Sequence, residues 1–398
     1  MNRAVSNLRP TAALVARMRR IRRILHSHPE LAFGEKRTGD LISAFLDELD
    51  IPYQRGVAGT GIIATLEGQT RGEQGDTVAL RADMDALPIA ENTGLDFASG
   101  IPGVMHACGH DGHVAMLLGA AALLRETPPV RGRIVLLFQP AEESGNGALK
   151  MIRAGVLENV NMIFAGHIDT HYPVGTFTVD EGVVCSYSDP FTIRIIGRGG
   201  HAARPHEAVD SVVVAANLIM SMQTLISRRI DPSRAAVVTI GKLRAGNVHN
   251  AIAEEALLEG TIRSTHPETR KEIHHGLNQV IQGSSEMCNA RITLSFFDNL
   301  PAVINEPRAT ALARQGAGLV VGANRVLSQG NPSLGGEDFA FYLQKVPGCL
   351  VRFGAATGDP ATGPAHSSGF DFDEDVLPLG AAWLANIALL ALDSPLTS

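Results

Sequence analysis

The sequence predicts a two-domain α/β protein, in which a mainly parallel sheet flanked by helices carries a smaller inserted α+β domain. The chain has 398 residues, more than one domain usually holds. Strand-like and helix-like segments alternate up to about residue 188, and strands separated by helices imply crossover connections in a parallel sheet. From about Asp189 the order of segments changes to βαββαβ, which is typical of a ferredoxin-like unit.

The first part of the chain alternates buried strands with apolar helices. After Pro10 and Thr11, apolar residues recur at helical spacing as far as Leu25 and predict a first helix. Strands are predicted at 60–66, 77–82, 133–138 and 161–168, and helices at 112–125 and 147–154. Polar clusters (RADMD, QPAEE and GHID) follow three of these strands. Because ligands of parallel sheets bind beyond the carboxyl ends of the strands, these clusters are candidate site residues.

The inserted domain is assigned to residues 189–299, so that 1–188 and 300–398 form the main domain. Within the insertion the pattern predicts strands at 191–197, 235–243, 256–264 and 290–297, and helices at 208–228 and 267–285. After Pro301 we expect long helical and Gly-rich segments, ending in an apolar helix at 378–392.

Composition excludes several classes of protein. Hydrophobic residues make up 45% and charged residues 19%, which rules out a disordered chain. The net charge of −7 provides no attraction for a nucleic acid. The four cysteines contain no CxxC pair, so we expect reduced thiols and a cytoplasmic location. No apolar run of about 18 residues is evident, so we expect no membrane partner.

The arginine-rich N-terminus leaves an alternative open. No acidic residue precedes Glu30, as in a mitochondrial presequence. The helical spacing of the apolar residues favours instead a first helix whose arginines face water.

The densest chemical cluster runs from Met105 to His113 and contains three histidines, Cys108 and an aspartate. Such a group, flanked by glycines that let the backbone approach a small ion, favours metal binding over packing. His167 ends a predicted strand, and His366 lies in a Gly- and Ser-rich loop. Each of these two histidines, taken alone, is more often structural than a metal ligand.

Glu142 and Glu143 follow the strand at 133–138. The plain alternative is a solvated acidic loop. Neighbours in an extended segment point to opposite sides, so one carboxylate can bind a metal while the other faces the substrate as a general base.

Together these residues resemble one family along nearly the whole chain, from LHSHPEL at 25–31 through HACGHD and PAEE to His366-Ser367. The resemblance is to the aminoacylase and carboxypeptidase metallopeptidases, in the branch of hippurate hydrolases, N-acyl-amino-acid hydrolases and plant indole-acetyl-amino-acid hydrolases. It implies a zinc-exopeptidase-like catalytic domain and an inserted domain that serves as a lid and a dimerisation surface.

The resemblance also implies roles for the clustered residues. Two divalent metal ions would be bound by Cys108, His110, Glu143, His167 and His366. Glu142 would be the general base. Asp85 matches an aspartate that orients the site, although Asp83 stands where related branches have a ligating histidine. Cys108 replaces the bridging aspartate of those branches, and its softer thiolate leaves Zn, Mn, Co and Ni open.

In the inserted domain, His201 of the segment GRGGHAARP would donate to the oxyanion, often from the other subunit. From sequence alone the segment could equally be a Gly-rich turn with a surface histidine. Asn250 and Arg263 match positions near the substrate carboxylate, and Gly336 and Glu337 belong to a GGEDF motif that lines the pocket.

The predicted function is a metal-dependent amidohydrolase. It would cleave the amide bond of small N-acyl amino acids by means of metal-activated water, with Glu142 as the base, and would act as a homodimer. Alternatives within the family are a dipeptidase or carboxypeptidase and a succinyl- or acetyl-diaminopimelate deacylase. An alternative from another class is a metal-binding protein that has lost catalysis; the presence of Glu142 and all five ligand types argues against it.

Overall fold

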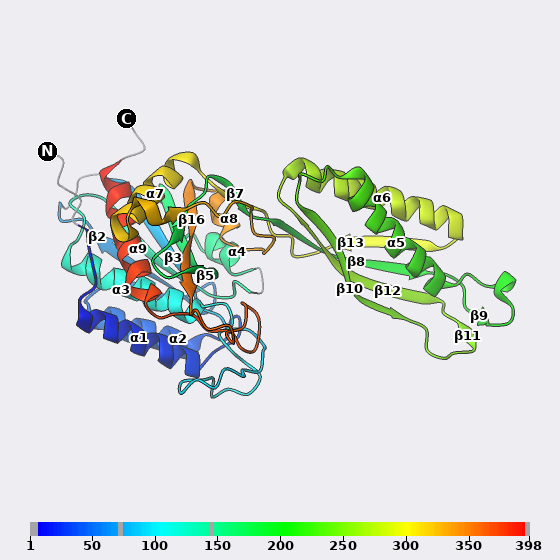
Figure 1. Ribbon diagram of the computed structural model, residues 1–398, viewed down its shortest axis with the longest axis horizontal. Coiled ribbons are helices and arrows are strands. Elements are labelled where there is room, and N and C mark those ends of the chain that lie inside the picture. Colours follow the sequence, from blue (N-terminus) through cyan, green and yellow to red (C-terminus); the bar gives the residue numbers. More distant parts are fainter. Residues whose placement is uncertain (1–6, 71–74, 144–145, 395–398) are drawn as a thin grey trace. The chain divides into compact units, whose positions relative to one another are not determined.

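The computed structural model describes residues 7–70, 75–143 and 146–394. The chain divides into two compact units (Figure 1). The first consists of the described residues up to Val184, of Ile304–Asn331 and of those from Asp338 onwards. The second consists of Cys185–Val303 and Pro332–Glu337.

The first unit is built on an eight-stranded sheet with the order β1-β2-β4-β3-β5-β16-β6-β15. The strands are β1 (Tyr53–Val57), β2 (Gly61–Glu67), β3 (Thr77–Asp83), β4 (Arg133–Gln139), β5 (Met162–Pro173), β6 (Phe177–Thr178), β15 (Val326–Leu327) and β16 (Gly348–Ala356). The four central strands β4, β3, β5 and β16 run parallel, while β2 pairs antiparallel with β4. The predicted mainly parallel α/β sheet is thus confirmed, with antiparallel additions at the edges.

Helices pack on both faces of this sheet. They are α1 (Ala12–Ser27), α2 (Lys36–Glu48), α3 (His110–Glu126), α4 (Gly147–Arg153), α7 (Pro307–Val321), α8 (Ala340–Leu343) and α9 (Val376–Asp393), with a 3-10 turn at Ala323–Arg325. α3 and α9 pack against each other and against β3, while α1 packs on α3 and α7 on α9. α4 packs against β4 and α8.

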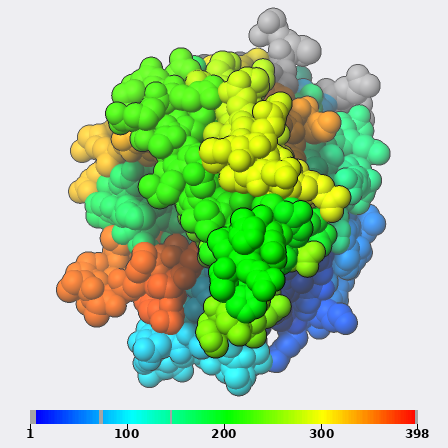
Figure 2. Space-filling view, turned by 90° about the vertical axis from the view of Figure 1, so that its right-hand side faces the viewer, coloured from blue at the N-terminus to red at the C-terminus, as the bar shows by residue number. Residues whose placement is uncertain are grey.

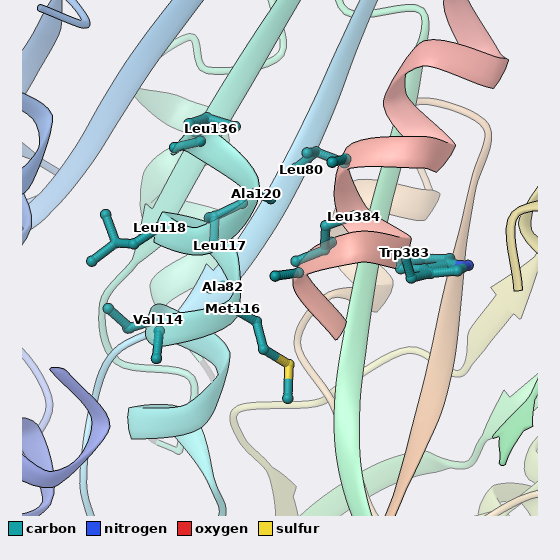
Figure 3. Packing of buried hydrophobic residues seen from close by; sticks show 14 of the residues in the cluster. Leu80, Ala82, Val114, Met116, Leu117, Leu118, Ala120, Leu136, Trp383 and Leu384 are labelled. Carbon is teal, nitrogen blue, oxygen red and sulfur yellow. The ribbon is translucent and has the colours of Figure 1, made fainter. Parts of the chain in front are cut away.

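The main core lies between the central strands and α3 and α9 (Figure 3). All seven residues of β3 are buried, as expected for a parallel strand covered on both faces. Leu80 and Ala82 face α3 and α9, whereas Arg81 points to the other face because side chains alternate along a strand. Trp383 of α9 is fully buried and donates its indole N–H to the carbonyl of Ala313 at 3.1 Å.

The second unit contains a four-stranded antiparallel sheet with the order β10-β12-β8-β13. Its elements are β8 (Tyr187–Ile196), α5 (Ser211–Arg229), β10 (Ala236–Ala245), β12 (Glu255–Ser264), α6 (Pro267–Cys288) and β13 (Arg291–Phe296). The chain order βαββαβ, with the first strand placed between the third and the fourth, is the ferredoxin-like arrangement. Smaller elements are β9 (Gly200–His201), a 3-10 turn at Pro205–Glu207 and β11 (Ala251–Ile252), while β7 (Gly182–Cys185) pairs with β14 (Val303–Asn305). The role of this unit as a lid stays a prediction.

Two predictions about elements were incomplete. After Pro301 the expected helices are present as α7 and α9, but the chain between them also contributes β16, which lies inside the sheet between β5 and β6. The helix expected from residue 208 begins at Ser211, because Asp210 accepts hydrogen bonds from the amides of Val212 and Val213 and thus caps it.

Among the residues that the structure describes, two helices are long and apolar enough to cross a membrane, contrary to the expectation from the sequence. In α9, 72% of the apolar stretch is buried inside the unit, so this helix belongs to the core of a folded domain. In α5 only 33% is buried, although its inner face packs on the sheet of the second unit.

Candidate metal centre

The site is assembled where β3, β4 and β5 end or pass into loops. Asp85 follows β3, Glu142 and Glu143 follow β4, and His167 lies in β5. The loop before α3 supplies Cys108 and the first turn of α3 supplies His110. Because β4, β3 and β5 are adjacent and parallel, these segments meet at one edge of the sheet.

Glycine is required at the turn between the first two candidate ligands. Gly109 has a φ of 86°, in the left-handed region, and it directly precedes the first residue of α3. This turn places the side chains of Cys108 and His110 in the same cluster.

The structure brings all five predicted metal ligands together. Cys108 Sγ lies 3.5 Å from Nε2 of His167 and 3.4 Å from Nε2 of His366. Glu143 Oε1 lies 3.4 Å from Nε2 of His366 and 3.9 Å from Nε2 of His110. The five donors form two overlapping groups of metal-binding geometry, one containing His110 and His167 and the other containing Glu143 and His366, with Cys108 common to both.

The chemistry of these donors fits divalent cations. Within the described residues, Nε2 of His110 and Oε1 of Glu143 are buried and make no well-aligned hydrogen bond, although Glu143 Oε1 lies 3.4 Å from Nε2 of His366. Unpaired buried polar atoms are costly, and a cation would satisfy both of them. Burial raises the pKa of the Cys108 thiol to about 12, so a thiolate at this position requires a cation beside it.

Backbone carbonyls fix the orientation of two of the histidine rings. Nδ1 of His110 lies 2.9 Å from the carbonyl oxygen of Asp85, and Nδ1 of His167 lies 2.6 Å from that of Ile168. A ring that donates from Nδ1 presents a lone pair at Nε2, which is the arrangement of metal-ligating histidines.

The Asp85 carboxylate holds the loop that carries the two glutamates. Its two oxygens accept the backbone N–H groups of Glu142 and Glu143, each at 3.0 Å. Glu142 itself is 9% exposed, and its Oε1 accepts the backbone N–H of Asp338 at 3.3 Å. The carboxylates of Asp85 and Glu142 therefore have defined positions beside the donor cluster.

Two histidines that contributed to the sequence argument do not belong to the donor set. His113 is occupied at both ring nitrogens, since Nδ1 contacts Asp83 at 2.6 Å and Nε2 accepts the N–H of Ile168 at 2.9 Å. His106 is fully buried, and burial lowers its pKa to about 4. Of the three histidines between Met105 and His113, only His110 faces the candidate site.

A buried network of ion pairs and hydrogen bonds next to the site was not predicted from the sequence. Arg81 pairs with Asp83 at 2.6 Å and with Asp338 at 3.0 Å, and Gln139 also donates to Asp338. Although burial opposes ionisation, the charge of Arg81 and the neighbouring histidines hold the pKa of Asp83 well below its usual range. The RADMD cluster was the available signal, but it does not identify the partners.

The remaining predicted residues lie in the second unit. His201 is exposed in β9 and accepts the N–H of Ala203 at Nδ1, while the carbonyl of the exposed Asn250 accepts the N–H of Ala202. A Cβ atom on Gly336 would lie 3.1 Å from the guanidinium of Arg263, so these two positions are adjacent. Glu337 is buried, with 3% of its surface exposed. The roles of these residues stay predictions.

Comparison with protein families gives a match to the description Peptidase family M20/M25/M40 over residues 79–390. A Bacillus subtilis protein named N-acetylcysteine deacetylase is 38% identical, with 96% of this chain and 98% of that protein aligned. The Arabidopsis thaliana protein named IAA-amino acid hydrolase ILR1-like 5 is 39% identical over 92% of this chain and 85% of its own length. A Rhodococcus jostii protein with a glutamate–cysteine ligase name is 41% identical, but the chain spans only 46% of its length.

Among solved structures, the Bacillus subtilis YXEP protein, described as a dinuclear metal binding peptidase from the M20 family, superposes with a TM-score of 0.84. It is 34% identical, and the match covers 97% of this chain and 100% of that one.

Proposed function

Because this chain belongs to the peptidase family M20/M25/M40, we propose that it cleaves N-acyl amino acids to a carboxylate and a free amino acid at a centre of two divalent cations. Relatives aligned almost end to end with the chain carry the names of amide hydrolases. The chain is accordingly a metal-dependent amidohydrolase, and its acyl and amino-acid preferences are part of the proposal.

The proposal rests on one observation: five candidate donor side chains lie close together. Two of their atoms, Nε2 of His110 and Oε1 of Glu143, are buried without a well-aligned hydrogen bond to any residue that the structure describes. One cation would be held by a group containing His110 and His167 and the other by a group containing Glu143 and His366, with Cys108 shared. Two such cations would supply a water of lowered pKa and polarise the scissile carbonyl. The mixture of thiolate, imidazole and carboxylate donors leaves Zn, Mn, Co and Ni as candidates.

Glu142 is proposed as the general base. Its carboxylate is nearly buried, lies beside the donor cluster and has one oxygen held by the backbone of Asp338. It would accept a proton from the attacking water and return it to the leaving amine. Asp85 is proposed as the residue that positions Glu142 and Glu143 through their backbone N–H groups.

The test separates catalysis from metal binding. Glu142→Gln should lower kcat by about 10²–10⁴-fold, the usual contribution of a general base, while elemental analysis still finds two metal ions per chain. Glu158→Gln, at an exposed position after α4, is the matched control and should match the wild type. Near-normal turnover of Glu142→Gln would contradict the mechanism.

Metal ligation is tested independently of turnover. Cys108→Ala and His366→Ala should each lower the metal content of purified protein, and a chelator should abolish hydrolysis until Mn, Co, Zn or Ni is returned. Unchanged metal content in both variants would remove these residues from the ligand set.

We propose that Arg263 binds the carboxylate of the substrate. Burial lowers the pKa of this guanidinium, although the charge of Asp189 raises it. Asp189 itself is bound by Arg270 and His274, and no ion pair of Arg263 is found among the described residues. An unpaired, partly buried arginine is suited to bind a carboxylate. Arg263→Lys should raise KM more than it lowers kcat, whereas an unchanged KM would exclude the assignment.

Substrate choice can be resolved by a hydrolysis screen. N-acetyl, N-benzoyl, N-lauroyl and indole-acetyl amino acids would be compared with a dipeptide and with succinyl-diaminopimelate, each with added Mn, Co or Zn. Preferential cleavage of one of the last two would replace the proposed substrate class by the corresponding family alternative.

A homodimer formed through the second unit is also proposed. One face of α5 exposes Val212, Val213 and Met220 at 46%, 61% and 66% of their surface, within the unit coloured green to yellow in Figure 2. Exposed apolar faces of this kind mark protein interfaces. Met220→Glu should shift sedimentation from dimer to monomer, and if His201 acts in trans, turnover should fall with it. A monomeric wild type would refute the proposal.

A cytoplasmic location is proposed because all four cysteines are free thiols. Fractionation of the source cells tests it, and recovery of the protein outside the cytoplasmic fraction would contradict it.

A further inference from the structure

The loop that carries the proposed general base contains a backbone conformation that needs support. Ala141, directly before Glu142, has a φ of 56° and is fully buried. This left-handed region is unfavourable for alanine, because its Cβ atom crowds the following carbonyl oxygen. The conformation decides in which direction the chain leaves Ala141, and therefore where the Glu142 side chain begins.

A buried carboxylate from a distant part of the sequence holds this residue. Glu35 has no exposed surface, and its Oε1 accepts the backbone N–H of Ala141 at 3.0 Å. Its Oε2 accepts the hydroxyl of Thr60 at 2.5 Å. Burying a carboxylate is costly unless it makes such hydrogen bonds, so its position calls for an explanation.

Helix capping does not provide this explanation. Glu35 directly precedes α2, yet its side chain makes no hydrogen bond to the start of the helix. Glu30 does so instead, accepting the backbone N–H groups of Arg37 and Thr38 at 3.1 and 2.9 Å. The Glu35 carboxylate is therefore committed to Ala141 and Thr60.

Other backbone groups of Ala141, Glu142 and Glu143 are also held. The carbonyl of Ala141 accepts the N–H of Gly147 at 3.1 Å, and Asp85 accepts those of Glu142 and Glu143. Glu35 thus completes a set of anchors in which each consecutive N–H from 141 to 143 donates to a buried carboxylate. Residues held in sparsely populated conformations persist only when the surrounding structure determines them in this way.

We propose that Glu35 is a positioning residue: it holds Ala141 in the left-handed conformation and thereby aims the Glu142 carboxylate at the reacting water. The inference rests on the proposed function, because it assigns Glu35 to the base of that reaction.

Two single variants test the inference by kinetics. Glu35→Ala removes the acceptor and should lower kcat by about 30-fold or more, with KM within about twofold and metal content unchanged. Glu35→Gln retains Oε1 for Ala141 and can donate to Thr60, so its kcat should stay within about threefold of the wild type. Equal losses in both variants would overturn the proposal.

The double variant Glu35→Ala/Ala141→Gly probes the conformation itself. Glycine adopts positive φ without the Cβ penalty, and relief of about 1 kcal/mol corresponds to about a fivefold recovery of kcat over Glu35→Ala. A role of Glu35 in general stability predicts no such recovery, so its absence would refute the inference.

Glu30→Ala is the matched control, since it removes a carboxylate from the same segment. It should lower the melting temperature through the lost cap of α2 and leave the kcat of the folded enzyme unchanged.

The failure of this inference can be distinguished from that of the proposed function. If the wild type hydrolyses N-acyl amino acids and Glu35→Ala retains its kcat, only the inference fails. If the wild type hydrolyses none of them, a crystal structure of Glu35→Ala decides: residue 141 leaves the left-handed region if Glu35 holds it, and an unchanged φ refutes the inference.

Discussion

His26 is expected to make the stability of the first unit depend on pH. This buried histidine lies 2.8 Å from Asp111 through Nδ1 and 3.3 Å from Glu91 through Nε2, and Arg22 also pairs with Asp111 at 3.0 Å. Burial lowers the pKa of His26, but the hydrogen bonds to Asp111 and Glu91 raise it by more. The pKa is therefore about 9 instead of the ordinary 6.5.

The size and the sign of the effect follow from this shift. A pKa raised by about 2.5 units corresponds to about 3 kcal/mol, at 1.36 kcal/mol per unit. Since protonation is favoured in the folded state, this stabilisation is fully present below pH 6.5 and is lost as the pH rises through 9. Between pH 6.5 and 9.5, the His26 contribution to the free energy of unfolding should fall by about 3 kcal/mol.

The assay uses the single tryptophan of the chain. Trp383 is fully buried in α9, so its fluorescence reports the unfolding of the first unit. Urea titrations of metal-free protein at pH 6.5 and 9.5 would give the free energy of unfolding by linear extrapolation. Metal-free protein is required because bound ions stabilise the folded state by mass action.

The comparison is between the wild type and His26→Gln. Other groups titrate in this range, so the quantity to measure is the difference between the two pH losses, which should be about 3 kcal/mol. His28→Gln, outside the contacts to Asp111 and Glu91, is the control and should lose as much as the wild type. Equal losses in the wild type and His26→Gln would refute the reasoning.

Three further predictions concern stability. Gly166→Ala should destabilise the first unit by about 1–3 kcal/mol or prevent folding, because a Cβ atom there would lie 2.1 Å from the ring of Phe353. Urea titration followed by Trp383 fluorescence measures the change, and unchanged stability would contradict the prediction. Gly283→Ala should stabilise the second unit by up to about 1 kcal/mol, because Gly283 lies in α6 and a Cβ atom added there would meet no other atom of the described residues. A lower melting temperature, measured by circular dichroism, would refute this prediction. Asp189→Asn should lower the free energy of unfolding of the second unit by about 2–3 kcal/mol at pH 7, because Arg270 binds both oxygens of this buried carboxylate at 2.6 and 2.7 Å. A decrease below about 0.5 kcal/mol, measured by urea titration, would count against a stabilising ion pair.

Much of the fold followed from hydrophobic patterning, where local sequence and burial agree. Strand 77–82 and helix 112–125 correspond to β3 and α3, which extend them by one or two residues. β16 was missed because its apolar run, CLV, is short and is followed by Arg352. Its place in the sheet depends on pairing with β5, which is distant in sequence and leaves no local signal.

The candidate site was predictable where motifs concentrate its residues. All five candidate metal donors and Glu142 were named from the sequence, and the structure places them together. The supports were not predictable, because Glu35, Arg81 and Asp338 act through contacts between distant segments. A glutamate before a helix, such as Glu35, would ordinarily be assigned to capping or to solvent.

The position of β16 determines when the molecule can be completed during synthesis. On the ribosome, Cys108, His110, Glu143 and His167 emerge before any part of the second unit, whereas β16 and His366 follow it. Until β16 is inserted, β5 has one unpaired edge, a surface on which nascent chains can aggregate. The contiguous Cys185–Val303, which forms most of the second unit, has then already been synthesised. A chain stalled on the ribosome before residue 348 would carry four of the five candidate donors, on a sheet that lacks β16. Its site would be incomplete, because His366 would be missing.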